Sequence, residues 1–232
     1  MVKVALTASS VTALTLVLGL PTASAQKADD QTASGIAGLE EVVITAQRRE
    51  ESLQDAAIPV QTFDQDQMTQ AGMESAQDLA LLSPALGISA GGGPLTSFFV
   101  RGVGALTVNP LTDSAIAQNY DGVYLGRSSG AAGQALYDLE RVELLKGPQG
   151  TLYGRNATGG VINYIPVKPI LDENSGYVQA EVGDYSKIGL QGSSNIAISD
   201  TVAIRVSGNK QERDGYTDDD TNDQDSKSFR GK

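Results

Sequence analysis

The sequence contains neither cysteine nor histidine, and each absence removes a class of site. Without cysteine there is no disulfide framework and no thiolate metal site. Without histidine, the commonest general base and the usual imidazole ligand of zinc or iron are missing. Carboxylates, serine, lysine or tyrosine would have to carry any catalysis, and no such constellation is present. We therefore expect no enzyme, no catalytic residues, no metal site and no cofactor.

Basic charge is also scarce, because 17 lysines and arginines face 28 acidic residues and the net charge is −11. Nucleic-acid binding needs a basic footprint, so we expect no nucleic-acid partner. Aromatic residues make up only 5% of the chain, whereas glycine occurs 26 times. Many glycines between short alternating runs favour a β-rich protein with tight turns.

The N-terminal residues 1–25 have the pattern of a secretory signal peptide. Lys3 precedes an apolar run from Val4 to Leu20, and Ala23-Ser24-Ala25 forms a small-residue cleavage site. The alternative is a transmembrane anchor, but the run is slightly short for a span of about 20 residues. We expect cleavage after Ala25 and export of the mature chain.

Residues 26–49 combine a flexible tether with a β-branched run. Gln26 to Gly38 is polar and small, without a period. The run EEVVITA follows, ending at Ala46. From the residues alone it is favoured as the first strand of the next domain, and the other interpretation is a strand that adds to the open edge of another sheet.

The next 120 residues or so predict a small mixed domain. Asp64 and Ser75 are suited to cap two short helices, which end near Gly72 and Ser83-Pro84. Asp121-Gly122 is a strong hairpin signal. We expect strands at 58–63, 87–90, 98–103, 115–120 and 123–125, and short helices around 68–70, 78–82 and 131–136.

The stretch from Leu139 to Pro166 organises this domain. Two half-buried strands, Arg141 to Lys146 and Gly160 to Ile165, flank a glycine-rich turn region. A phosphate cradle is a weaker alternative, because the Gly-x-x-x-x-Gly-Lys-Ser/Thr pattern is absent. Asn156-Ala157-Thr158 matches a glycosylation acceptor, which is common by chance.

From Tyr177 onward the sequence changes to long, regular alternation. Val178 and Val182 fall on one face of the first run and Gln179 and Glu181 on the other. Each run is near the ~9–11 residues of a tilted membrane strand. A soluble antiparallel sandwich would alternate in the same way. We expect a long acidic loop over 211–225, whose Asp218 to Asp220 cluster lacks the EF-hand spacing and favours a solvated loop over a calcium site.

The run ERVELLKGPQGTLYGRNATGGVIN resembles the closing motif of the plug domain of TonB-dependent receptors, which lie in the outer membrane of Gram-negative bacteria. LSPAL, FVRG and DGVYLGR resemble further segments of this family in the same order. The resemblance implies an α+β plug domain, a small mixed sheet with short helices, at residues 50–170. It implies that residues 171–232 begin an antiparallel transmembrane β-barrel.

The resemblance also assigns roles to residues. EEVVITA resembles a TonB box, the segment that pairs with the TonB energy-coupling protein; the residues expected to pair are Glu41, Val42, Val43, Ile44, Thr45 and Ala46. Plug arginines of the family meet carboxylates on the barrel wall, a role expected here for Arg101 and Arg155. Loops at 91–97 and 106–112 are expected at the outer, cargo-facing end.

These implications predict a receptor that contacts outer-membrane lipid and imports a scarce small molecule, with ferric siderophores as the first expectation. The alternative is a periplasmic plug-like binding module without a pore. Plugged transporters use about 22 strands, and at ~10 residues per strand residues 176–232 supply three strands and the start of a fourth. We therefore expect this sequence to be the truncated, N-terminal part of a longer receptor.

Overall fold

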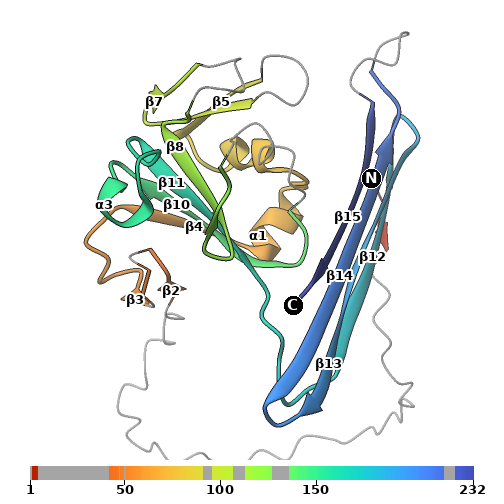
Figure 1. The fold of residues 1–232 in the computed structure, drawn as a ribbon. Coiled ribbons are helices and arrows are strands. Elements are labelled where there is room, and N and C mark those ends of the chain that lie inside the picture. The colour runs from red at the N-terminus through yellow and green to blue at the C-terminus, as the bar shows by residue number, and fades with distance from the viewer. Residues whose placement is uncertain are drawn as a thin grey trace, which may run out of the picture.

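The computed structural model describes residues 2–4, 42–46, 48–49, 51–90, 96–106, 113–126, 136–216 and 223–232. They form a plug built around one mixed sheet and, beside it, a sheet of long strands (Figure 1). Outside these ranges lie nearly all of the predicted leader, Glu41, most of the loops 91–97 and 106–112, most of the predicted helix 131–136, and the Asp218 to Asp220 cluster.

Within the described ranges, no helix combines the length and hydropathy needed to cross a membrane.

The plug sheet is mixed, as predicted. It runs in the order β4 (Val60–Asp64), β10 (Leu139–Lys146), β11 (Gly160–Pro166), β8 (Ile116–Tyr120) and β9 (Val123–Tyr124). Strands β10 and β11 are antiparallel, β11 and β8 are parallel, and β8 and β9 form the predicted hairpin. Its turn places Asp121 and Gly122 at φ of 49° and 79°, the left-handed pair that a two-residue hairpin turn requires.

Strand β11 is buried on both faces, which corrects the expectation of a half-buried strand. Ile162 and Tyr164 point to the larger core, together with Leu144 of β10, while Val161 and Leu145 point to a second core on the opposite face. The correction has a simple cause, because β11 is a central strand and each face of the sheet is covered by a different part of the chain.

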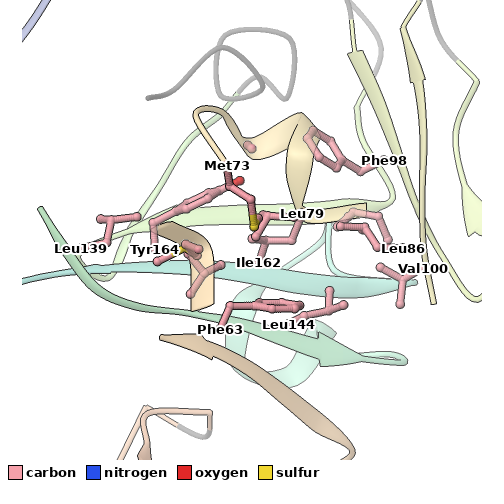
Figure 2. Packing of buried hydrophobic residues seen from close by; sticks show 14 residues of the cluster. Phe63, Met73, Leu79, Leu86, Phe98, Val100, Leu139, Leu144, Ile162 and Tyr164 are labelled. Carbon is pink, nitrogen blue, oxygen red and sulfur yellow. The ribbon is translucent and has the colours of Figure 1, made fainter. Parts of the chain in front are cut away.

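Two capped helical turns cover the first face of the plug sheet. Helix α1 (Gln65–Gln70) begins at Asp64, whose Oδ1 accepts the Gln67 N–H at 2.7 Å. The second, η1 (Ala76–Leu81), is a 3₁₀ helix, and the Ser75 N–H at its start donates to Asp78 Oδ2 at 2.8 Å. Figure 2 shows Met73, from the link between α1 and η1, and Leu79, from η1, lying over Ile162 and Tyr164.

The strand predicted over 98–103 is interrupted. Arg101 and Gly102 turn the chain at φ of 51° and 78°, between β6 (Thr96–Val100) and β7 (Val103–Gly104). With β5 (Leu86–Ala90) these strands make a separate antiparallel sheet. The glycine-rich stretch between β10 and β11 also contains a single helical turn, α3 (Gly150–Tyr153), that was not predicted.

The long strands form one antiparallel sheet beside the plug. Its order is β1 (Val2–Val4), β12 (Ser175–Gly183), β13 (Lys187–Ser199), β14 (Val202–Arg213) and β15 (Gln224–Gly231). The pairs Glu212 with Asp225 and Arg213 with Gln224 lengthen β14 and β15. The loop between them is therefore 214–223, shorter than the 211–225 that was predicted.

These strands place polar side chains inward and apolar side chains outward. Asn195 and Arg205 are 1% and 8% exposed, whereas their neighbours Ile196 and Ile204 are 51% and 43% exposed. A soluble sandwich buries its apolar face, so this sheet has the opposite polarity. An outward apolar face with an inward polar face is the pattern of a membrane barrel wall.

Candidate functional site

The segment 42–46 is folded onto the second face of the plug sheet. Strand β2 (Val43–Ile44) pairs antiparallel with β3 (Glu51–Ser52), and the Leu53 N–H donates to the Val42 carbonyl at 2.8 Å. Ile44 and Ala46 are fully buried in the second core, whereas Val42 and Val43 remain about 42–44% exposed. The segment thus has an exposed start, at Val42 and Val43, and a buried end, at Ile44 and Ala46.

A buried carboxylate of the plug binds the middle of this segment. The Thr45 N–H donates to Glu143 Oε1 at 2.8 Å, and the Thr45 hydroxyl lies 3.2 and 3.1 Å from the two carboxylate oxygens. Glu143, on β10, is 0% exposed. Its charge is balanced by Arg141, whose Nε donates to Oε1 at 2.9 Å.

Tyr153 of α3 holds the backbone that follows. Its hydroxyl donates to the Ala46 carbonyl at 2.9 Å and accepts from Asn163 Nδ2 at 3.1 Å. Burial raises the pKa of Tyr153 above its ordinary value, so the phenol stays protonated and remains a donor at neutral pH. The guanidinium of Arg48 lies 5.4 Å from the centre of the Tyr153 ring, where a cation–π contact fixes the ring.

The free energy that holds the segment is close in size to the cost of ordering it. Fixing five residues costs about 5–10 kcal/mol of backbone entropy. Burying Ile44 returns about 2–3 kcal/mol, and hydrogen bonds to a charged group return about 1.5–3 kcal/mol each. Because these contributions are similar in size, each hydrogen bond is a substantial share of the free energy that holds the segment on the plug.

A second cluster joins the plug to the long strands. Asp138 precedes β10, is 2% exposed and adopts a left-handed φ of 49°. Nε of Arg205, on β14, lies 3.1 Å from both Asp138 carboxylate oxygens. Nη2 of Arg230, on β15, lies 2.9 Å from Oδ2 and also donates to the Asp138 carbonyl at 2.7 Å. One plug carboxylate thus binds guanidinium groups from neighbouring strands.

Two further ion pairs also join a carboxylate of the plug to a cation outside the plug. Lys187 at the start of β13 pairs with Glu74 of the plug, and Lys232 lies 2.7 Å from Asp121 Oδ2 in the β8–β9 turn. In the described residues the plug supplies the carboxylates of these pairs and the strands supply the cations. This polarity is the reverse of the arrangement expected for Arg101 and Arg155.

The two arginines chosen from the sequence lie elsewhere in the plug. Arg101 occupies the exposed turn between β6 and β7. The side chain of Arg155 is 84% exposed, and its Nε is 4.0 Å from Asp113, which also belongs to the plug. Neither arginine pairs with a carboxylate of β12–β15 among the described residues, so their contact with a barrel wall stays a prediction.

Sequence reasoning missed Glu143 and Asp138. Glu143 lies within the predicted half-buried strand Arg141 to Lys146, but the sequence pattern assigned it no role. A buried partner for Thr45 becomes visible only when residues 98 positions apart are brought together. For Asp138 the only available signal was an acidic residue directly before a buried strand, which is also common on surfaces.

The described residues thus define a plug that is packed on the inner face of a membrane barrel wall. Residues 52–161 match the family model described as TonB-dependent Receptor Plug Domain. Residues 52–161 of the chain are therefore a plug domain of the kind found in TonB-dependent receptors. The fold class predicted from the sequence is confirmed.

Two relatives are similar to part of this sequence. Over 104 residues the chain is 38% identical to the pesticin receptor of Yersinia pestis, an alignment that covers 44% of this chain and 15% of the receptor. Over 183 residues it is 27% identical to the vitamin B12 transporter of Vibrio vulnificus, which covers 75% of this chain and 28% of the transporter. The alignments thus span only 15% and 28% of the length of these relatives.

Solved structures share the fold. The ferric yersiniabactin uptake receptor of Yersinia pestis superposes with a TM-score of 0.63 at 26% identity, covering 75% of this chain and 28% of the receptor. The ferripyoverdine receptor of the outer membrane of Pseudomonas aeruginosa, bound to ferripyoverdine, gives a TM-score of 0.70 at 21% identity, over 82% of this chain and 25% of the receptor.

Proposed function

We propose that this protein acts as a TonB-dependent receptor in the outer membrane of a Gram-negative bacterium, where it imports a scarce small molecule. The observation that carries the proposal is the plug packed through Asp138 against strands whose outer face is apolar. A plug in this position closes the lumen, so cargo passes only when the plug rearranges. The activity is gated transport.

The positions of the plug segments at the two ends of the molecule support a direction of transport. The segment 42–46 lies at the same end of the molecule as the short β13–β14 turn, whereas β5 and β7 lie at the opposite end (Figure 1). Short turns of such barrels face the periplasm and longer loops face outside. The segment therefore faces the periplasm, from which the energy-coupling protein approaches.

The mechanism follows from these positions. Cargo binds at the outer end, the segment 42–46 leaves the plug, and its extended backbone pairs with a strand of the TonB energy-coupling protein. Force on the segment then rearranges the plug inside the lumen. For cargo we propose a ferric siderophore, since relatives of this fold are named for ferric yersiniabactin and ferripyoverdine; the relative named for vitamin B12 makes cobalamin the second candidate.

Replacing Val43 with proline tests the coupling role. Proline removes the N–H that strand pairing needs, while the half-exposed valine contributes little to the core. We expect Val43→Pro to abolish uptake of radiolabelled cargo, chosen from a panel of ferric siderophores and cobalamin, and to leave cargo binding to outer membranes unchanged. Val43→Ala keeps the N–H and retains uptake. Normal uptake by the proline variant would remove the coupling role.

The alternative, a periplasmic binding module without a pore, is separated by fractionation. A receptor is recovered with outer membranes and migrates differently on gels before and after heating. A periplasmic module is recovered in the soluble fraction. The outward apolar side chains of β12–β14 favour the first outcome.

A further inference from the structure

Glu143 has two sets of hydrogen-bond donors, and only one of them belongs to the segment 42–46. Thr45 supplies its N–H and hydroxyl from the segment. Arg141 Nε at 2.9 Å and Asn163 Nδ2 at 3.4 Å come from β10 and β11 of the plug itself. When the segment leaves, the carboxylate keeps its counter-ion and water can replace the threonine.

This division makes the contact reversible. A buried carboxylate without a partner is costly, so a site that relied on the segment alone could not release it readily. Arg141 remains within the same strand and also pairs with Glu140, which keeps the cation in place. Tyr153 is similarly supported by Asn163 and loses only its backbone acceptors on release.

We propose that Glu143 and Tyr153 form a latch, which holds the segment 42–46 on the plug and sets how often that segment is available to its coupling partner. The proposal rests on the function proposed above and adds the regulation of the same segment. The latch acts on the backbone and on Thr45, whereas Val42 and Val43 stay exposed. The coupling partner can therefore contact Val42 and Val43 before the latch opens.

Cysteine labelling measures the opening directly, because this sequence contains no other thiol. Ala46 is fully buried, so Ala46→Cys reacts with a water-soluble maleimide only when the segment leaves the plug. Val42→Cys is the accessible reference. In isolated outer membranes we expect Ala46→Cys to react much more slowly than Val42→Cys. Equal rates would show that the segment is not held, and would overturn the proposal.

Two further substitutions, each combined with Ala46→Cys, are designed to open the latch. Thr45→Val removes the hydroxyl bonds to Glu143 without touching the plug, and Tyr153→Phe removes the donor to the Ala46 carbonyl. Each is expected to raise the labelling rate of Ala46→Cys by about tenfold or more, the loss that follows from one hydrogen bond to a charged or buried group. Thr151→Val, an exposed threonine of α3, is the matched control and leaves the rate unchanged.

The outcomes separate the latch from the proposed function. Unchanged labelling in both Thr45→Val and Tyr153→Phe overturns the latch, while the uptake assay with Val43→Pro still reports on coupling. Normal uptake by Val43→Pro overturns the coupling function, while labelling still reports on docking. Glu143→Gln is a third test of the latch. Normal cargo binding by this variant serves as the control that its plug is folded.

Discussion

At the scale of single residues, Asp138 connects the two parts of the molecule. Its carboxylate is buried between guanidinium groups from β14 and β15, and Ser193 Oγ accepts a further bond from Arg205 Nη2 at 2.8 Å. Arg230 also lies 4.9 Å from the centre of the Tyr137 ring. This carboxylate neutralises the buried Arg205 and the partly buried Arg230, so its removal leaves both charges without this partner.

We expect Asp138→Asn to loosen the plug from the strands. Removing one partner of a buried ion pair costs about 3–5 kcal/mol, and two arginines are affected here. In isolated outer membranes, the plug of this variant should become sensitive to protease at a lower urea concentration. Asp121→Asn is the control, because its pair with Lys232 is partly exposed and contributes below about 1 kcal/mol. Equal shifts for both variants would contradict this ranking.

Residues with a local signal were predictable and residues with a distant partner were not. Asp64 was predicted as a helix cap because its partner, the Gln67 N–H, is three positions away. The segment 42–46 was found through its sequence pattern. Glu143 and Asp138 were missed because their partners lie 98 and 67 or more positions away, and no short motif encodes such contacts.

At the scale of elements, the close approach of β10, β11 and β6 depends on Gly160. A Cβ at this position would lie 2.6 Å from the Leu145 carbonyl oxygen and 3.2 Å from Val100. Gly122 has the opposite requirement, since space around it is open but its φ is +79°. One glycine is needed for room and the other for conformation.

Substitutions distinguish these two requirements. Gly160→Ala is expected to destabilise the plug by about 1–3 kcal/mol through overpacking, and Gly160→Asn by more. Gly122→Ala is expected to cost roughly 1–2 kcal/mol, while Gly122→Asn is nearly neutral because asparagine tolerates the left-handed region. The urea concentration at which the plug becomes sensitive to protease ranks the four variants by stability. A plug that is more stable with Gly160→Asn than with Gly160→Ala would contradict the steric explanation.

The element types were predictable because the periodicities and caps are local. The hairpin at Asp121-Gly122, the strands β10 and β11 and the two capped helical turns are all present. The break at Arg101 and the turn α3 were missed, since arginine carries no turn signal and α3 has only four residues. Strand ends were inaccurate, because pairing with a neighbour extends β14 and β15 beyond their own alternating pattern.

At the scale of the whole molecule, the direction of the alternation separates a soluble sheet from a barrel wall. The period of two was visible in the sequence, but which face would be buried was not. The structure resolves this, because Ser207 and Asn209 face the plug while Val202 and Ile204 face outward. Polar inward residues can pair with plug carboxylates, and apolar outward residues are suited to lipid.

The most direct test of this account measures what surrounds each face of the strands. Nitroxide labels placed singly at Leu190, Ile196 and Ile204, and in a second set at Ser193, Ser207 and Asn209, are compared in isolated outer membranes by their collision rates with oxygen and with a water-soluble nickel chelate. The account predicts that the first set collides mainly with oxygen dissolved in lipid, and that the second set is shielded from both reagents by the plug. Access of the nickel chelate to the first set would contradict it.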